Sequence, residues 1–126
     1  MSATRQLPLT AVDGIEAKDG GFVGRKKVGA DDPYLSGHFP SLTVYPGVFL
    51  IEGVQQMLEL HLDGVLGGIE LVSVESARFS LPVLAGDEVL FDTRVTGTRP
   101  LLTTTTTCTV DGRRCARIAA TWRSAS

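Results

Sequence analysis

The period of the apolar positions differs between two long segments of the chain. Between residues 88 and 96, apolar or threonine positions alternate with charged ones, which predicts a strand with one buried and one exposed face. From Pro46 to Asp63 the pattern changes: the first half is apolar almost all round, as in a helix buried inside a protein. Pro46 suits the first turn of such a helix, and Gly64 lies where it would end.

Further strands are predicted by β-branched and apolar runs between turn residues. Asp19-Gly20 and Asp111-Gly112 are hairpin signals, and Arg99-Pro100 indicates another turn. A run of five threonines lies between apolar residues and reads as strand, because threonine favours extended backbone. The expected strands cover residues 7–17, 22–28, 71–79, 88–96, 101–110 and 114–123.

Two strands, one long helix and four more strands predict an α+β fold. We expect one long central helix wrapped by a curved antiparallel sheet of about five to six strands. A sheet covers only one side of a helix, while this helix carries apolar residues on several sides. We therefore expect a partner subunit, most simply in a symmetric homodimer, with a higher oligomer or a heterodimer left open.

Composition narrows the class of protein. The chain has 126 residues, 43% of them hydrophobic and 21% charged, which fits a single globular domain over residues 1–126. A net charge of −2 gives no support to nucleic-acid binding. No apolar run is long enough to span a bilayer, and the first residues lack the pattern of a signal peptide, so we expect a cytoplasmic protein. Cys108 and Cys115 are then expected to be reduced thiols, although a disulfide stays open.

The candidate chemistry lies in residues 37–56, which contain His38 and Glu52. A histidine titrates near neutral pH, and a carboxyl group in an apolar helix holds its proton more readily, so the two could form a base and an acid. Structural alternatives exist, because His38 could be an ordinary loop residue. Glu52 could belong to a solvated stripe that also contains Gln55, Gln56, Glu59 and Asp63. Glu52 is the only charge from Pro46 to Val54, so we expect the early part of the stripe to face a site and the late part to face solvent.

The segment GHFPSLTVYPGVFLIEGVQQ resembles the signature of the 3-hydroxyacyl-[acyl-carrier-protein] dehydratases, which have the hotdog fold. The shared features are His38-Phe39-Pro40, Pro46-Gly47-Val48, Glu52 and Gln56, at unchanged spacing. The later stretch from Ala77 to Val89 also resembles the family, and the likeness extends from about residue 7 to residue 122.

This resemblance implies that His38 is the catalytic base and Glu52 the catalytic acid in the dehydration of a 3-hydroxyacyl thioester to a trans-2-enoyl thioester. His38 of one subunit would face Glu52 of the other. Gly47 would polarise the thioester carbonyl through its N–H, and Gln56 would position the acid. No metal or organic cofactor is needed.

Two further neighbours in the signature, Phe39 and Val48, are expected to contact substrate. The partner implied by the resemblance is an acyl carrier protein. If it is acidic, the basic cluster from Arg25 to Lys27 could attract it, with Arg78 and Arg99 as further candidates.

Two positions depart from the family pattern: Ser41 replaces a glycine and Thr43 replaces a proline. Both lie in the loop that carries His38, so a polyketide or polyene pathway is as plausible as fatty acid synthesis. Two other classes stay open. One is a hotdog acyl thioesterase, which the His-Phe-Pro loop disfavours. The other is a non-catalytic subunit of a heterodimer, which the presence of both His38 and Glu52 disfavours.

Overall fold

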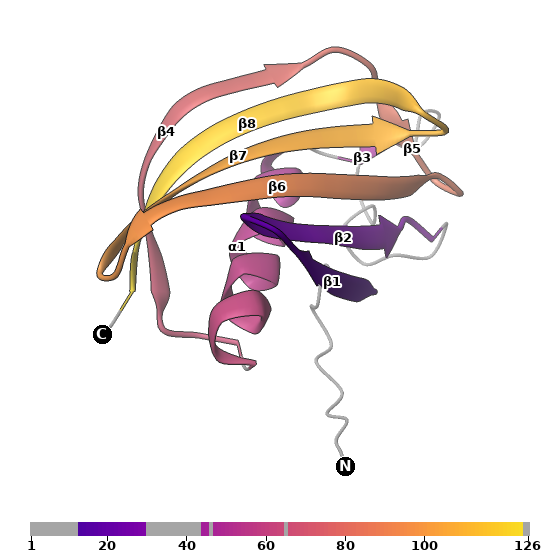
Figure 1. Cartoon of the computed structure of the whole chain (residues 1–126). Coiled ribbons are helices and arrows are strands. Elements are labelled where there is room, and N and C mark those ends of the chain that lie inside the picture. Colours follow the sequence, from indigo (N-terminus) through magenta and orange to yellow (C-terminus); the bar gives the residue numbers. More distant parts are fainter. Residues whose placement is uncertain (1–12, 30–43, 46, 65, 125–126) are drawn as a thin grey trace.

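The computed structural model describes residues 13–29, 44–45, 47–64 and 66–124. Six strands of this part are β1 (Gly14–Lys18), β2 (Gly21–Lys27), β4 (Ile69–Phe79), β6 (Glu88–Thr98), β7 (Leu101–Val110) and β8 (Arg113–Ser124). They form one antiparallel sheet in the order β1-β2-β6-β7-β8-β4 (Figure 1). Two short strands, β3 (Val44–Tyr45) and β5 (Val83–Leu84), pair with each other.

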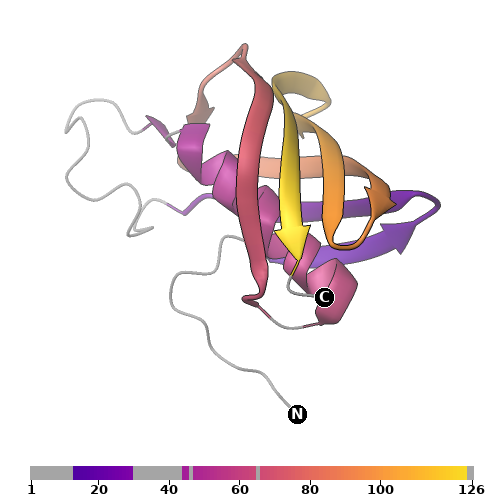
Figure 2. The same ribbon diagram turned by 90° about the vertical axis from the view of Figure 1, so that its left-hand side faces the viewer.

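The helix α1 (Gly47–Asp63) lies on one face of this curved sheet, as Figures 1 and 2 show from two directions. The side chains of Leu50, Val54, Met57 and Leu58 are buried. Their spacing of three and four residues places them on one side of the helix, so this side faces the sheet. The predicted α+β arrangement is confirmed, and the helix ends at the predicted residue.

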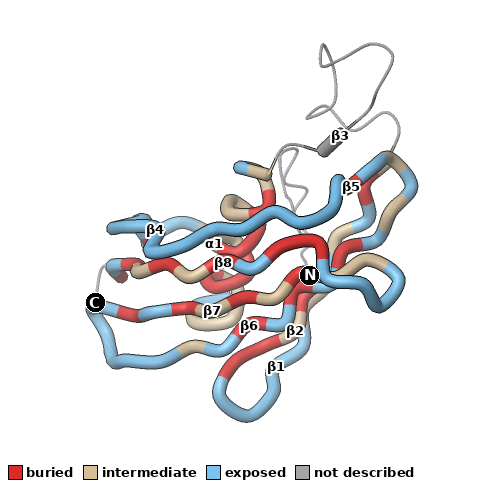
Figure 3. Tube along the Cα trace, turned by 90° about the horizontal axis from the view of Figure 1, so that it is seen from above, coloured by how far each residue is buried: buried red, intermediate tan, exposed pale blue. Residues whose placement is uncertain are grey.

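Figure 3 shows that burial alternates along the central strands. In β6, Val89, Phe91 and Thr93 are buried, whereas Asp92 and Arg94 are exposed. The same period holds in the threonine run of β7. One face of the sheet therefore packs on the helix and the other is open, as the alternation predicts.

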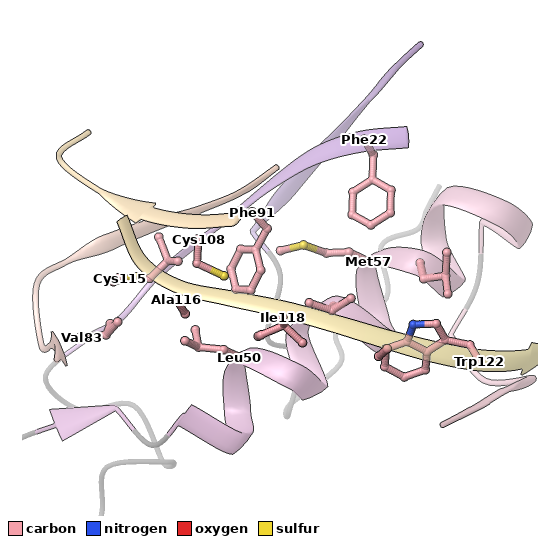
Figure 4. Close-up of a cluster of buried hydrophobic side chains, with 14 of the residues drawn as sticks. Phe22, Leu50, Met57, Val83, Phe91, Cys108, Cys115, Ala116, Ile118 and Trp122 are labelled. Carbon is pink, nitrogen blue, oxygen red and sulfur yellow. The ribbon is translucent and has the colours of Figure 1, made fainter. Parts of the chain in front are cut away.

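The hydrophobic core fills the space between α1 and the sheet (Figure 4). Trp122, Phe22 and Phe91 are its largest buried side chains. Met57 of the helix packs against Gly24 of β2 so closely that a Cβ on this glycine would lie 2.4 Å from the Met57 sulfur. The missing side chain of Gly24 thus makes room for the helix.

Three turns are confirmed at their predicted residues. Asp19-Gly20 joins β1 to β2, with Lys18 opposite Gly21. Asp111 and Gly112 both have positive φ, 52° and 78°, as a two-residue hairpin of the right twist requires. The turn at Arg99 also contacts the end of the helix, because the Arg99 guanidinium lies 2.5 Å from the Asp63 carboxylate.

Among the described strands, β4 lies at one edge of the sheet and has β8 as its only neighbour. All of its residues after Ile69 are exposed, and four are large and apolar: Leu71 (44%), Val72 (46%), Val74 (39%) and Phe79 (49%). On the helix, Val48 is 62% exposed. The expectation that the sheet leaves part of the apolar helix uncovered is thus met in the single chain.

Several sequence predictions differ from the structure in detail. The strands β3 and β5 were not predicted, because two residues are too few to show a period. The strands β4, β6 and β8 extend one or two residues beyond their expected ends. Cys108 and Cys115 are free and buried, which decides between the two readings of the cysteines. Among the described residues, no helix has both the length and the apolarity needed to cross a membrane.

Candidate active site

The first described residue of α1, Gly47, lies at a pocket of about 280 Å³. The first N–H groups of a helix have no partner within it and point outward, so a negatively charged oxygen is favoured there. Glycine also exposes the backbone. A Cβ at this position would lie 2.9 Å from the Phe79 ring. The other residues that line the pocket are Leu50, Ser80, Leu81, Pro82 and Val83.

Glu52 and Gln56 lie one turn apart on α1, and both are half-buried in the single chain. Glu52 comes five positions after Gly47, which corresponds to a rotation of about 140° around the helix axis. The two are therefore on different sides of α1. Glu52 and Gln56 do not line the pocket at Gly47.

The rest of the polar stripe is only partly as expected. The Gln55 side chain donates a hydrogen bond to the Ile69 carbonyl oxygen (2.8 Å), and Asp63 pairs with Arg99. The prediction that the late part of the stripe faces solvent is wrong for Glu59, which is only 4% exposed. Helical period assigns a residue to a side of the helix, but it does not tell how deeply other segments cover that side.

His38 and Phe39 lie outside the described residues, so their roles stay predictions. Val48 is described and points largely to solvent in the single chain. Of the six predicted site residues, the structure therefore places four, all of them on α1: Gly47, Val48, Glu52 and Gln56. It brings only Gly47 to the pocket.

The residues from Phe79 to Val83 form most of the pocket and were not predicted as site residues. They run from the last residue of β4 to the first residue of β5, and the backbone N–H groups of Ser80 and Leu81 donate to the Cys115 carbonyl oxygen. A signal was present, because they fall within the second stretch of family resemblance. Pattern alone could not place them beside a helix start more than thirty residues earlier.

The described part of the chain holds no group of three or more histidine, cysteine or acidic side chains arranged to bind a metal ion. That the reaction needs no metal or cofactor stays a prediction.

Comparison with known proteins identifies the family. The FabA-like domain matches residues 7–119. The 3-hydroxyacyl-[acyl-carrier-protein] dehydratase FabZ of Thermotoga neapolitana is 36% identical over 94 residues, which cover 73% of this chain and 69% of that protein. The FabZ of Rhizobium johnstonii is 39% identical over 95 residues, covering 71% and 61%. The resemblance found in the sequence is confirmed.

Solved structures show the same fold. The dehydratase heterocomplex ApeI:P from Xenorhabdus doucetiae matches with a TM-score of 0.64 at 20% identity, over 81% of this chain and 86% of that one. The (R)-hydratase from A. caviae involved in PHA biosynthesis matches with a TM-score of 0.63 at 24% identity, over 80% and 91%. Taken together with the helix on its curved six-stranded sheet, these matches show that the chain is a hotdog-fold member of the FabA-like domain family.

Proposed function

We propose that this protein dehydrates 3-hydroxyacyl thioesters carried on acyl carrier protein to trans-2-enoyl thioesters. The observation that carries the proposal is the placement of Gly47 at a pocket and of Glu52 farther along the same helix, at the spacing of the FabZ-like signature. The curated relatives are named for this activity. Both fatty acid and polyketide or polyene synthesis use this reaction.

In the proposed reaction, His38 takes the proton from C2 of the acyl chain. The electron pair of that C–H bond forms the C2=C3 double bond, and the hydroxyl group leaves C3 with a proton from Glu52 as water. Negative charge develops on the thioester oxygen during this step. The N–H of Gly47 at the positive end of the α1 dipole would stabilise it.

The angle between Gly47 and Glu52 supports a site built from two subunits. The two residues differ by about 140° around the axis of α1. The Glu52 side chain therefore points away from a thioester bound at Gly47 of the same helix. We propose that Glu52 of a second copy, facing His38 and Gly47 of the first, completes each site. The unpaired edge of β4 and its exposed Leu71, Val72 and Val74 support pairing of two copies there.

The activity is tested with purified protein and a 3-hydroxyacyl thioester, following the ultraviolet absorbance of the conjugated enoyl product. His38→Ala and Glu52→Gln should each lower the rate about 10² to 10⁴-fold. Glu16→Gln is the matched control, because Glu16 is exposed on β1 at the opposite edge of the sheet, and it should keep full activity. Full activity in either active-site variant would refute the proposal. Release of free thiol would instead indicate a thioesterase.

The dimer is tested by replacing Val72 and Val74 together with lysine, since charges on an edge strand oppose pairing. The variant should be a monomer in sedimentation equilibrium and inactive, whereas the parent protein should be a dimer. Leu90→Lys is the control, because Leu90 is equally exposed (41%) but lies on β6 in the middle of the sheet. A monomeric and active parent protein would contradict the two-subunit site. A cytoplasmic location stays a prediction.

A further inference from the structure

Four arginines share the face of the sheet that is turned away from α1. Arg78 of β4 lies directly opposite Arg117 of β8. Arg117 and Arg114 lie opposite Thr107 and Thr109 of β7, which are two residues apart and so point to the same face. Arg94 of β6 lies opposite Thr105, which belongs to the same row. We call Arg78, Arg94, Arg114 and Arg117 the arginine surface.

This surface carries four positive charges, whereas the whole chain carries a net charge of −2. None of its four guanidiniums forms an ion pair within the described residues. Asp92 is the acidic residue nearest along β6, and it already pairs with Lys18. Glu75 accepts hydrogen bonds from Ser73 and Thr121. Two arginines directly opposite each other repel, so this pair of like charges destabilises the fold.

The arginine surface borders the candidate active site. Arg78 precedes Phe79, whose ring lies against Gly47 at the pocket. Arg117 follows Ala116, which lies opposite Phe79 in the sheet. Successive residues of a strand point to opposite faces, so the arginines and the pocket lie on the two faces of the same strand ends. The thioester arm of a carrier docked on the arginines would pass the end of β4 at Phe79, where the chain enters the pocket, and not the side of β4 that is proposed to face a second copy.

We infer that the arginine surface is the docking site for the acidic side chains of the acyl carrier protein that brings the substrate. This inference rests on the proposed function. It replaces most of the earlier candidates for this contact: Arg25 lies 3.8 Å from Glu88, Arg99 pairs with Asp63, and Lys26 also has a partner. Of the predicted basic residues, Arg78 is the one that belongs to the surface.

The size and chemistry of the surface fit a protein. From β6 to β4 it spans three strand spacings, about 14 Å, which is wider than a single phosphate group but matches carboxylates on successive turns of a helix. Guanidinium groups bind carboxylates with two parallel hydrogen bonds. Between Arg94 and Arg117, a hollow of about 350 Å³ is also lined by Thr105, Thr107 and the ion pair of Lys18 with Asp92. The described residues of this face include no aromatic side chain on which a base could stack.

The test compares one acyl group on two carriers: holo acyl carrier protein and N-acetylcysteamine. Arg78→Glu/Arg117→Glu should lower kcat/KM for the protein-bound substrate about tenfold or more, and leave kcat/KM for the small thioester unchanged. Arg123→Glu is the matched control, because Arg123 lies on the same face of β8, six residues or about 20 Å away, and should change neither value. Equal effects on both substrates, or none, would overturn the inference. If the parent protein dehydrates neither the protein-bound nor the small thioester, the proposed function is refuted instead.

Binding of the acyl carrier protein can be measured without catalysis. Fluorescence anisotropy with labelled holo acyl carrier protein should show binding that weakens as salt is raised, and that is lost in the double variant. Arg78→Gln/Arg117→Gln, which removes charge without reversing it, should weaken binding less, and circular dichroism verifies that each variant is folded. No binding by the parent protein, unchanged binding by the double variant, or equal binding of single-stranded DNA would each overturn the inference.

Discussion

Gly47 and Phe79 are in such close contact that a Cβ on Gly47 would lie 2.9 Å from the Phe79 ring. One residue begins the helix and the other ends β4, so this contact joins the two elements that form the pocket. Phe79 is 49% exposed, so its ring is not locked inside the packed core. A side chain on Gly47 would therefore disturb the pocket more than the fold.

Gly47→Ala should lower kcat/KM about 100-fold, because displacement of the ring by about an ångström misplaces the thioester against its N–H donor. The free energy of unfolding should change by less than about 1 kcal/mol, since alanine favours the helix and offsets the crowding. Steady-state kinetics and urea denaturation measure the two effects. Adding Phe79→Leu should restore part of the activity. Parent-like activity in Gly47→Ala would contradict this role of the contact.

Gly24→Ala should destabilise the protein by about 1–3 kcal/mol, because the new methyl group overlaps the Met57 side chain inside a packed core. Urea denaturation of the parent, Gly24→Ala, Met57→Ala and the double variant completes a thermodynamic cycle. The effects should not add, since removing the Met57 side chain relieves the overlap. Additive losses would mean that Gly24 does not make room for Met57.

Three buried threonines form two kinds of hydrogen bond in the core. The Trp122 indole N–H donates to the Thr104 hydroxyl (2.8 Å), whereas Thr93 and Thr106 hydrogen-bond each other (2.9 Å). Thr104→Val leaves the buried indole N–H without an acceptor and should cost about 1–3 kcal/mol. Replacing Thr93 and Thr106 together with valine removes both partners and should be nearly neutral. Thermal and urea denaturation compare the variants, and equal losses would disprove the distinction.

The two buried cysteines predict how stability depends on pH. Burial raises the pKa of the Cys108 thiol above its ordinary value of 9.0, and burial also raises the pKa of Cys115. Above about pH 9 the unfolded chain loses these protons while the folded chain keeps them. The free energy of unfolding should therefore be unaffected by the thiols below that pH and fall above it, by up to about 1.4 kcal/mol per pH unit for the Cys108 thiol.

Urea denaturation from pH 8 to pH 10.5 measures this slope. Cys108→Ala loses some stability at every pH. Above pH 9, however, its free energy of unfolding should fall less steeply with pH, because the contribution of one thiol is missing. The folded protein should also react slowly with a thiol reagent at pH 8 and rapidly once unfolded. An unchanged slope in Cys108→Ala would exclude the thiol as its cause.

Much of the fold could be predicted because its signals are local. The alternation in β6, the glycine turns at Gly20 and Gly112, and the end of α1 at Asp63 each depend on residues within a few positions of one another. The short strands β3 and β5 gave no such signal. Glu59 showed the limit of helical period, which assigns a side but not its burial.

The candidate site divides in the same way. The likeness to the dehydratases could be predicted because Gly47, Glu52 and Gln56 lie in one short segment of the chain, at fixed spacing on one helix. Phe79 beside Gly47, and the residues up to Val83, could not be found by spacing, because they come from a different strand. The roles of His38 and Phe39 stay predictions, as does the single domain over residues 1–126.

By itself, the amino-acid sequence determined the kinds of element, the turns between them, the family and the residues of the proposed acid–base pair. Only the tertiary structure decided that β4 is an edge strand, that Gly47 meets Phe79, and that Arg78 lies opposite Arg117. The physical reason is the register of the sheet. Pairing β4 with β8 places Arg78 opposite a residue 39 positions later in the chain. A shift of one residue would turn each side chain to the other face, so the contacts depend on the whole packed core rather than on any local pattern.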